Sequence, residues 1–193
     1  MSTFENIKKG IPNKITLPIA LKKLCEWTEQ NGYPISGCFE LRADDGQTMD
    51  YWTGYPTDKN LTDRLGFFGV GSTGDLYGFW IDKAGNQKII YLSTEGGGER
   101  YVLANNFVDF LRLLAIGYDE IGWADMNKSP EEWNVEQGLN KNEGINPKFR
   151  EWVEQEFQVK TPKKGAEIAD FDNKEFYNWT EEQIKRLAKN RAM

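Results

Sequence analysis

The residue pattern with the most direct link to a known chemistry is Gly69-Val70-Gly71-Ser72-Thr73-Gly74, which matches the GxGxxG fingerprint of dinucleotide-binding loops. In that chemistry a helix begins at the third glycine, so that its N-terminal amides meet the pyrophosphate. Here the motif is followed by residues 75–81, whose apolar alternation is typical of a strand. The sequence therefore predicts a glycine-rich hairpin turn and no bound nucleotide or other cofactor.

A second glycine-rich stretch, Glu95-Gly96-Gly97-Gly98-Glu99, also invites comparison with a phosphate-binding loop. It lacks the Lys and the Ser or Thr that such a loop uses to hold phosphate and magnesium. The carboxylates at its two ends would repel a phosphate. We expect a flexible loop here.

Carboxylates form the remaining groups of chemical interest. Paired carboxylates can hydrolyse glycosidic bonds, and the tryptophans of the chain could stack on sugars, so a small carboxylate-based glycosidase is one alternative. The Asp44-Asp45-Gly46 turn lacks the further oxygen ligands of a calcium-binding loop. More often, carboxylate clusters of this kind lie in solvated turns or on helix faces, or they contact a partner protein. The clusters are Asp44/Asp45, Asp119/Glu120/Asp125 and Glu131/Glu132/Glu136.

Other catalytic and metal-binding groups are scarce in this chain. It has no histidine, the side chain most used for acid–base work and metal ligation near neutral pH. Ser72, Ser93 and Thr94 have neither a GxSxG context nor a histidine base. Cys25 and Cys38 are the only cysteines and form no CxxC pair, which predicts reduced thiols and no metal site. We therefore predict a binding protein that is not an enzyme.

Net charge narrows the class of partner. Lys and Arg number 24 and Asp and Glu number 30, which gives a formal charge of -6. Nucleic-acid binding normally needs a surface rich in Lys and Arg, so direct contact with DNA or RNA is disfavoured. An acidic surface suits a cationic protein and speeds the encounter with it, although the same charge also serves solubility.

Length and hydropathy predict a protein outside the membrane. The 193 residues fit one ordinary domain with a substantial core. The longest apolar runs are far below the ~18 residues of a membrane span, and the N-terminal residues 1–10 lack the apolar core of a signal peptide. We expect a cytoplasmic location.

Two helices and a set of strands are expected in the first part of the chain. Apolar residues at helical spacing between Leu17 and Trp27 predict a helix that ends at Asn31-Gly32. A strand is expected over 37–42, a turn at 44–46, a weaker strand over 48–53 and a loop over 55–62. Further strands are expected at 76–81, 88–93 and 101–103. Asn106 is expected to cap a second helix, with Phe107, Phe110, Leu111 and Leu114 on its apolar face and Gly117 at its end.

The strand at Leu76–Ile81 is apolar on both faces, with Leu76, Gly78 and Trp80 on one and Tyr77, Phe79 and Ile81 on the other. Such a strand belongs in the middle of a sheet that is covered on both sides. The chain then predicts an α+β fold with a central antiparallel sheet flanked by helices.

The remainder, residues 118–193, predicts a helical C-terminal extension that packs on this 1–117 domain within the same globular unit. Helices are expected at 130–137, 147–157 and 180–189, the last two with start signals at Asn146-Pro147 and at Thr180 with Gln183. Its aromatic side chains should anchor it to the main domain. They are Trp123, Trp133, Trp152, Phe157, Phe171, Phe176, Tyr177 and Trp179.

Three segments together resemble the SUKH superfamily of bacterial immunity proteins and fungal cell-wall-synthesis regulators. They are Gly74–Asp82, with its Gly-Asp and aromatic strand, then Ile89–Leu92, and finally Val102–Leu111, whose Asn106 stands where Ser is common. The likeness covers about residues 12–117. It implies an α+β fold with a central antiparallel sheet, and a function by binding without family-wide catalytic residues. Many bacterial members look like antidotes that neutralise a toxin, frequently a nuclease, encoded beside them.

From charge and resemblance together, we predict an immunity or interaction protein whose acidic loops and aromatic sheet face engage a basic toxin domain. A regulatory scaffold of the cell-wall type is the alternative within the same fold. The expected steering carboxylates are Asp44, Asp45, Glu95 and Glu99, with Trp52 and Tyr55 as aromatic anchors.

Overall fold

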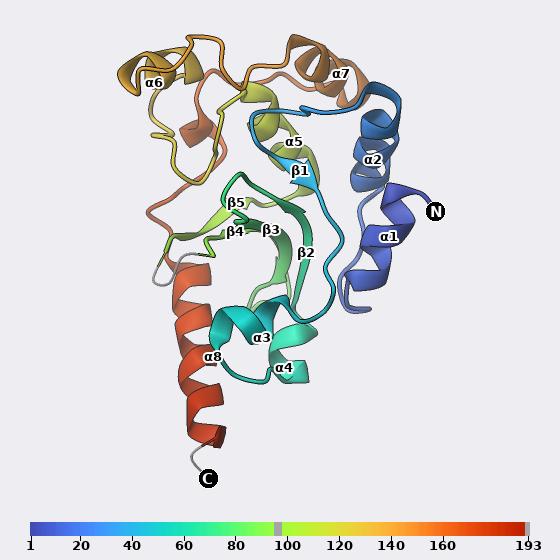
Figure 1. The fold of residues 1–193 in the computed structure, drawn as a ribbon, viewed down its shortest axis with the longest axis vertical. Helices are drawn as coiled ribbons and strands as arrows, with labels where there is room; N and C mark the ends of the chain where they lie inside the picture. The colour runs from blue at the N-terminus through green and yellow to red at the C-terminus, as the bar shows by residue number, and fades with distance from the viewer. Residues whose placement is uncertain (95–97, 192–193) are drawn as a thin grey trace.

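The computed structural model describes residues 1–94 and 98–191, and in these the chain forms an α+β fold around one sheet (Figure 1). The sheet has five strands in the order β1-β2-β3-β4-β5, and each neighbouring pair is antiparallel. The strands are β1 (Glu40–Leu41), β2 (Leu65–Val70), β3 (Leu76–Ile81), β4 (Gln87–Leu92) and β5 (Arg100–Ala104). The predicted fold class is confirmed.

Helices lie on both sides of this sheet. Helices α1, α2 and α5 stand on one side, and α3, α4 and α8 on the other, with α8 running away from the sheet towards the C-terminus (Figure 1). The helices are α1 (Thr3–Gly10), α2 (Ile19–Asn31), α3 (Thr48–Thr53), α4 (Lys59–Thr62), α5 (Phe107–Ile116), α6 (Pro130–Glu136), α7 (Pro147–Phe157) and α8 (Glu175–Arg191), with a short 3-10 turn η1 at Gly165–Glu167.

The GxGxxG motif forms the hairpin turn between β2 and β3, as predicted. The Gly71 N–H donates to the Asp75 carbonyl at 2.8 Å and closes the turn. Gly74 has a φ of 85°, a left-handed conformation that glycine adopts without strain. Because β3 follows immediately, no helix N-terminus is present at the third glycine.

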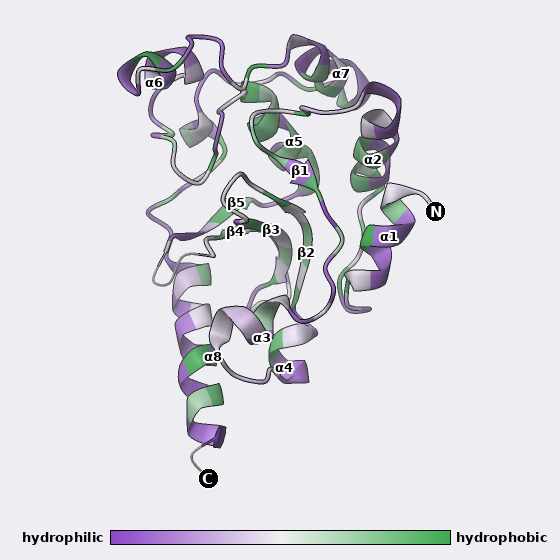
Figure 2. Cartoon of the chain, viewed as in Figure 1, coloured by the Kyte–Doolittle hydropathy of each residue, from purple (hydrophilic) through white to green (hydrophobic). Residues whose placement is uncertain are grey.

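The first face of the sheet carries the larger hydrophobic core. Phe68, Tyr77, Phe79, Tyr91 and Leu103 are almost fully buried there. They pack against the apolar stripe of α5, where Phe110 lies 5.5 Å from Phe68 between ring centroids. Helix α5 is bounded as predicted, with the Asn106 side chain accepting the Asp109 N–H and Gly117 at its C-cap. The first face is thus closed by apolar and aromatic packing, and α5 is coloured largely hydrophobic in Figure 2.

The second face carries a separate cluster. Phe67, Leu76, Trp80 and Ile90 point to this face, opposite to their neighbours along each strand. Helices α3, α4 and α8 cover it with Met49, Leu61, Phe176, Trp179 and Leu187. The alternation predicted for β3 is confirmed, and both faces of the strand are buried.

The C-terminal segment contributes to both faces. Tyr118, Phe149 and Val153 belong to the core of the first face, and Gly37 lets the segment approach closely. A Cβ at Gly37 would lie 2.2 Å from the Asp119 carbonyl oxygen. Of the predicted aromatic anchors, Phe176 and Trp179 are buried, whereas Trp123 is 55% exposed.

Residues 48–53 form helix α3, so the predicted strand at this place is wrong. Thr, Tyr and Trp favour strands, but Met49 and Thr53 are four residues apart and both buried, which is the spacing of one helix face. The Thr53 hydroxyl donates to the Met49 carbonyl at 2.7 Å, and Gly54 ends the helix in the left-handed conformation. Tertiary burial therefore decides against the local strand preference.

Several other elements also differ from the predictions. Of the expected strand 37–42, Glu40–Leu41 form β1, and Gly37, with a φ of 48°, turns the chain before it. Helix α1 was not predicted. Helix α4 lies inside the expected loop 55–62, capped by the Asp58 side chain.

The last helix begins at Glu175, where the Asn173 side chain accepts the Glu175 N–H at 2.9 Å. Thr180 was predicted as its cap, but it lies inside the helix and is 1% exposed. No helix in the described part of the chain is long and apolar enough to cross a membrane.

Candidate functional site

A groove of about 460 Å³ lies between helix α3 and the β2–β3 hairpin. Its residues come from the loop after β1, from α3, and from the strand ends that meet the hairpin turn. They are Arg42, Ala43, Asp44, Asp45, Thr48, Tyr51, Trp52, Phe67, Gly69, Val70, Gly74, Leu76 and Thr94. Three of the predicted partner-binding residues, Asp44, Asp45 and Trp52, are thus brought together.

The floor of the groove is apolar and its wall is aromatic. Phe67, Val70 and Leu76 line it from the second face of the sheet and are at least nine-tenths buried. Tyr51 on α3 is 77% exposed, and its hydroxyl donates a hydrogen bond to the Gln47 side chain on the preceding turn, at 3.1 Å. An exposed ring beside an apolar floor gives the groove a surface that a partner side chain could bury.

Trp52 forms the inner part of this wall and is held rigidly. Its indole N–H donates to the Ser93 carbonyl at 2.9 Å, and the Arg100 guanidinium lies 5.1 Å from its ring centroid. The ring also packs on the cluster of the second face. Trp52 is therefore half-buried, so most of the exposed aromatic area belongs to Tyr51.

Asp44 and Asp45 form an acidic edge of the groove. One oxygen of Asp44 accepts the Gly46 N–H at 3.2 Å and the Thr48 hydroxyl at 2.5 Å, and one oxygen of Asp45 accepts the Gln47 N–H at 2.9 Å. Neither carboxylate forms an ion pair with any residue that the structure describes. Both charges are available to a cationic partner.

Two features brace the loop that carries these carboxylates. Helix α1 packs behind it, since a Cβ at Gly10 would lie 2.5 Å from the Asp44 carbonyl oxygen. On the groove side, the Arg42 backbone N–H donates to the Phe68 carbonyl at 2.9 Å, which continues the β1–β2 pairing. The Arg42 side chain lines the groove and has no ion-pair partner within residues 1–94 and 98–191.

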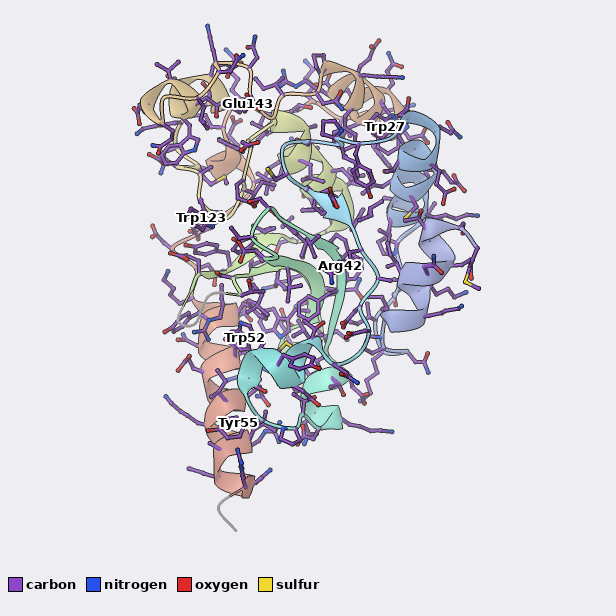
Figure 3. The ribbon with its side chains drawn as sticks, in the orientation of Figure 1. Trp27, Arg42, Trp52, Tyr55, Trp123 and Glu143 are labelled. Atoms are coloured by element: carbon purple, nitrogen blue, oxygen red, sulfur yellow. The ribbon has the colours of Figure 1, made fainter. Side chains whose placement is uncertain are left out.

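The other predicted residues lie outside the groove. Tyr55 follows α3 and packs on the second-face cluster, beside α8 in Figure 3. Glu99 lines a different hollow with Tyr101, Trp123 and Phe171, and Figure 3 shows Trp123 well apart from Trp52. Glu95 lies outside the described residues.

The aromatic sheet face is not a contact surface, contrary to the prediction. Tyr77, Phe79 and Trp80 are at most 1% exposed, because the chain covers both faces with its own helices. Exposed aromatic side chains instead lie beside the sheet, those of Tyr51 on α3 and of Trp123.

Asp75 is a buried carboxylate with several hydrogen-bond donors, and no role was predicted for it. It is fully buried at the start of β3, where it accepts hydrogen bonds from the Tyr91 hydroxyl at 2.6 Å, the Thr73 hydroxyl at 2.6 Å and the Thr94 N–H at 2.9 Å. Burial opposes its ionisation, but these donors prevail and hold the pKa of Asp75 below its ordinary value. The sequence feature that could have indicated this structural role is the pair Gly74-Asp75 directly before an apolar strand.

The carboxylates considered for glycoside hydrolysis also have local partners. Glu120 accepts the Tyr77 hydroxyl at 2.9 Å and the Ser72 N–H at 3.0 Å, which ties the hairpin to the segment after α5. Asp125 pairs with Lys128 at 3.4 Å, and Glu132 completes the capping box of α6. Within the described residues, no group of His, Cys, Asp and Glu side chains is arranged to hold a metal ion.

Comparison of the chain with protein-family models, with curated proteins and with solved structures finds no match.

Proposed function

We propose that this protein acts by binding another protein, as an immunity protein of the SUKH type, and that the groove beside α3 is its contact surface. The observation that carries the proposal is the combination, in one groove, of an exposed Tyr51, a buried apolar floor and two carboxylates without ion-pair partners. Interfaces use buried aromatic anchors for affinity and complementary charge for encounter.

This combination specifies the chemistry of the partner. A cation on the partner can reach Asp44 and Asp45, while an apolar side chain beside it covers the floor and packs on Tyr51. Nuclease toxins carry basic surfaces because they bind nucleic acid, so an acidic antidote can occupy the same surface. The net charge of -6 favours the same encounter.

The α+β architecture, with its antiparallel sheet and flanking helices, agrees with the fold that the SUKH resemblance implies. The cell-wall regulator shares this fold and differs in its partner. Neighbouring genes separate the two proposals: an adjacent gene for a large secreted toxin supports immunity, and its absence supports regulation.

The experiment is a neutralisation assay with the toxin domain encoded beside the gene. Cells that express the toxin should survive when the protein is co-expressed. The double variant Asp44→Asn/Asp45→Asn and the single variant Tyr51→Ala should weaken toxin binding by about 1–2 kcal/mol each, a loss of roughly five- to thirty-fold in affinity.

Two matched controls accompany these variants. Ile19→Ala removes an apolar side chain that is 76% exposed on α2, and Glu5→Gln/Glu151→Gln removes two exposed carboxylates on α1 and α7. Both should neutralise the toxin as well as the unaltered protein. The absence of neutralisation by the unaltered protein, or equal losses in controls and groove variants, would overturn the proposal.

A further inference from the structure

We infer that Arg100 is a positioning residue: it couples the docking of the C-terminal helix α8 to the Trp52 wall of the groove. Arg100 opens β5 on the second face of the sheet and is 4% exposed. Its neighbours on that face, Leu92 and Val102, are apolar. A buried guanidinium in such surroundings is stable only when its charge and its N–H groups are satisfied.

Apart from the Gly98 carbonyl, which accepts the Arg100 Nε–H at 3.4 Å, the partners of Arg100 among the described residues come from two elements. On α8, its Nη1 donates to the Thr180 hydroxyl at 2.8 Å and to the Glu181 carboxylate at 2.9 Å, and its guanidinium lies 4.2 Å from the Tyr177 ring centroid. On α3, the same guanidinium lies 5.1 Å from the centroid of Trp52. Arg100 therefore stands between the C-terminal helix and the wall of the groove.

Helix α8 supplies the negative charge that balances the buried Arg100. Glu181 is the carboxylate that pairs with Arg100 in the described structure. When α8 leaves the sheet, Arg100 loses Glu181, Thr180 and the Tyr177 ring together, and the guanidinium then turns towards water. Trp52 then loses one of the contacts that position its ring and keeps its hydrogen bond to the Ser93 carbonyl.

A second contact of α8 holds the chain segment that follows the groove wall. Arg186 forms a bidentate pair with Asp58, with Nη2 at 2.8 Å from Oδ1. Asp58 also caps α4 by accepting the Asn60 and Leu61 N–H groups. Helix α8 thus holds the segment that runs from α3 to α4 at both of its ends, and its docking sets the position of the groove wall.

Two adjacent residues of α8 provide a matched test. Glu181 pairs with the buried Arg100, whereas Glu182 pairs with the exposed Lys83 at 3.0 Å. Glu181→Gln and Glu182→Gln each remove one ion pair from α8, but only the first reaches Trp52. The readouts are the indole N–H resonance of Trp52, assigned by comparison with Trp52→Phe, and the amide exchange of α3.

With Glu181→Gln, the Trp52 resonance should move and the α3 amides should exchange roughly five-fold faster or more, as expected for loss of a charged hydrogen bond. Glu182→Gln should leave the resonance in place and change exchange by less than about two-fold, because exposed pairs contribute little. Equal effects of the two variants, or no effect of Glu181→Gln on Trp52, would overturn the coupling.

If Glu181→Gln does not fold, Arg100→Lys takes its place with the same readouts, since it keeps the charge and loses the planar fork. The coupling rests on the proposed function only for the importance of the groove, and its test uses the protein alone. A moved Trp52 resonance with no toxin neutralisation would reject the immunity role and keep the coupling. Toxin neutralisation with an unmoved Trp52 resonance would reject the coupling and keep the immunity role.

Discussion

The two faces of the sheet are both buried, but different interactions close them. On the first face, aromatic rings from β2, β3 and β4 interlock with α5, and most ring pairs lie between 4.8 and 5.7 Å apart. On the second face, α8 packs through Phe176, Trp179 and Leu187 and is also held by ion pairs to Asp58, Lys83, Lys88 and Arg100. The groove opens on this second face.

The two faces therefore differ in what their contacts contribute to the protein. Interlocking apolar side chains give stability that depends little on pH or salt, whereas ion pairs and charged hydrogen bonds respond to both. The second face also contains two buried indole N–H groups, of Trp80 and Trp179, with no acceptor among the described residues. We therefore assign stability chiefly to the first face and adaptable contact to the second.

The largest effect is expected from the first face. Phe110→Ala should lower the free energy of unfolding by about 3–5 kcal/mol, because it leaves a cavity among Phe39, Phe68, Tyr77 and Phe107. Urea titration measures the change, and Val135→Ala on the exposed side of α6 is the control. A loss below about 1 kcal/mol would contradict the role given to this face.

A somewhat smaller effect is expected from Asp75, which joins the hairpin to β4. Asp75→Asn keeps the shape but replaces an acceptor-only group with one that also carries donors, so the Tyr91, Thr73 and Thr94 donors are no longer all satisfied. We expect a loss of about 2–3 kcal/mol in urea titration. Asp172→Asn, at an exposed position, should cost nothing measurable.

The second face should show a smaller, pH-dependent effect. Arg186→Ala removes a partly exposed pair and should cost about 0.5–1 kcal/mol at pH 6. The hydrogen bond from Arg186 lowers the pKa of Asp58 below its ordinary 3.8. The stabilisation is therefore present above that pH and is lost as pH falls through the lower pKa of the folded state.

The measurement for this pair is urea titration of Arg186→Ala and the unaltered protein at pH 6 and near pH 3. The difference between them should shrink at the lower pH. A difference that stays constant would show that the ion pair does not hold α8.

The smallest effect on stability is expected at the groove. Tyr51→Ala should change the free energy of unfolding by less than about 0.5 kcal/mol, because the ring is 77% exposed. Urea titration beside the toxin-binding assay separates the two readouts. A large loss of stability would mean that Tyr51 is a structural residue and would remove the main support for the groove.

The sequence predicts those elements whose signals are local. The β3 strand and helices α5 and α7 have the expected bounds, because apolar periodicity, Asn106 and Asn146-Pro147 mark them within a few residues. Helix α3 was missed because its residues favour a strand locally, and only burial of Met49 and Thr53 against the sheet selects the helix. The local preference of residues for strand or helix gives the wrong element where packing against the rest of the fold selects the structure.

The same reasoning explains what could be predicted of the site. Asp44, Asp45 and Trp52 lie within nine positions of one another, so a turn and one short helix bring them together. Glu99 is distant in sequence, and the sheet places it beside Trp123 instead. The role of Arg100 depends on α8, which is about 80 residues further along the chain, and no local pattern reveals it.

The most direct test of the central claim is the rate at which the protein associates with the proposed toxin domain, measured at low and high salt. Asp44→Lys/Asp45→Lys should slow association at least ten-fold at low salt, and the difference should largely vanish at high salt. Glu5→Lys/Glu151→Lys serves as the matched control and should have a clearly smaller effect. Equal rates for the groove variant and the unaltered protein at low salt would contradict the account.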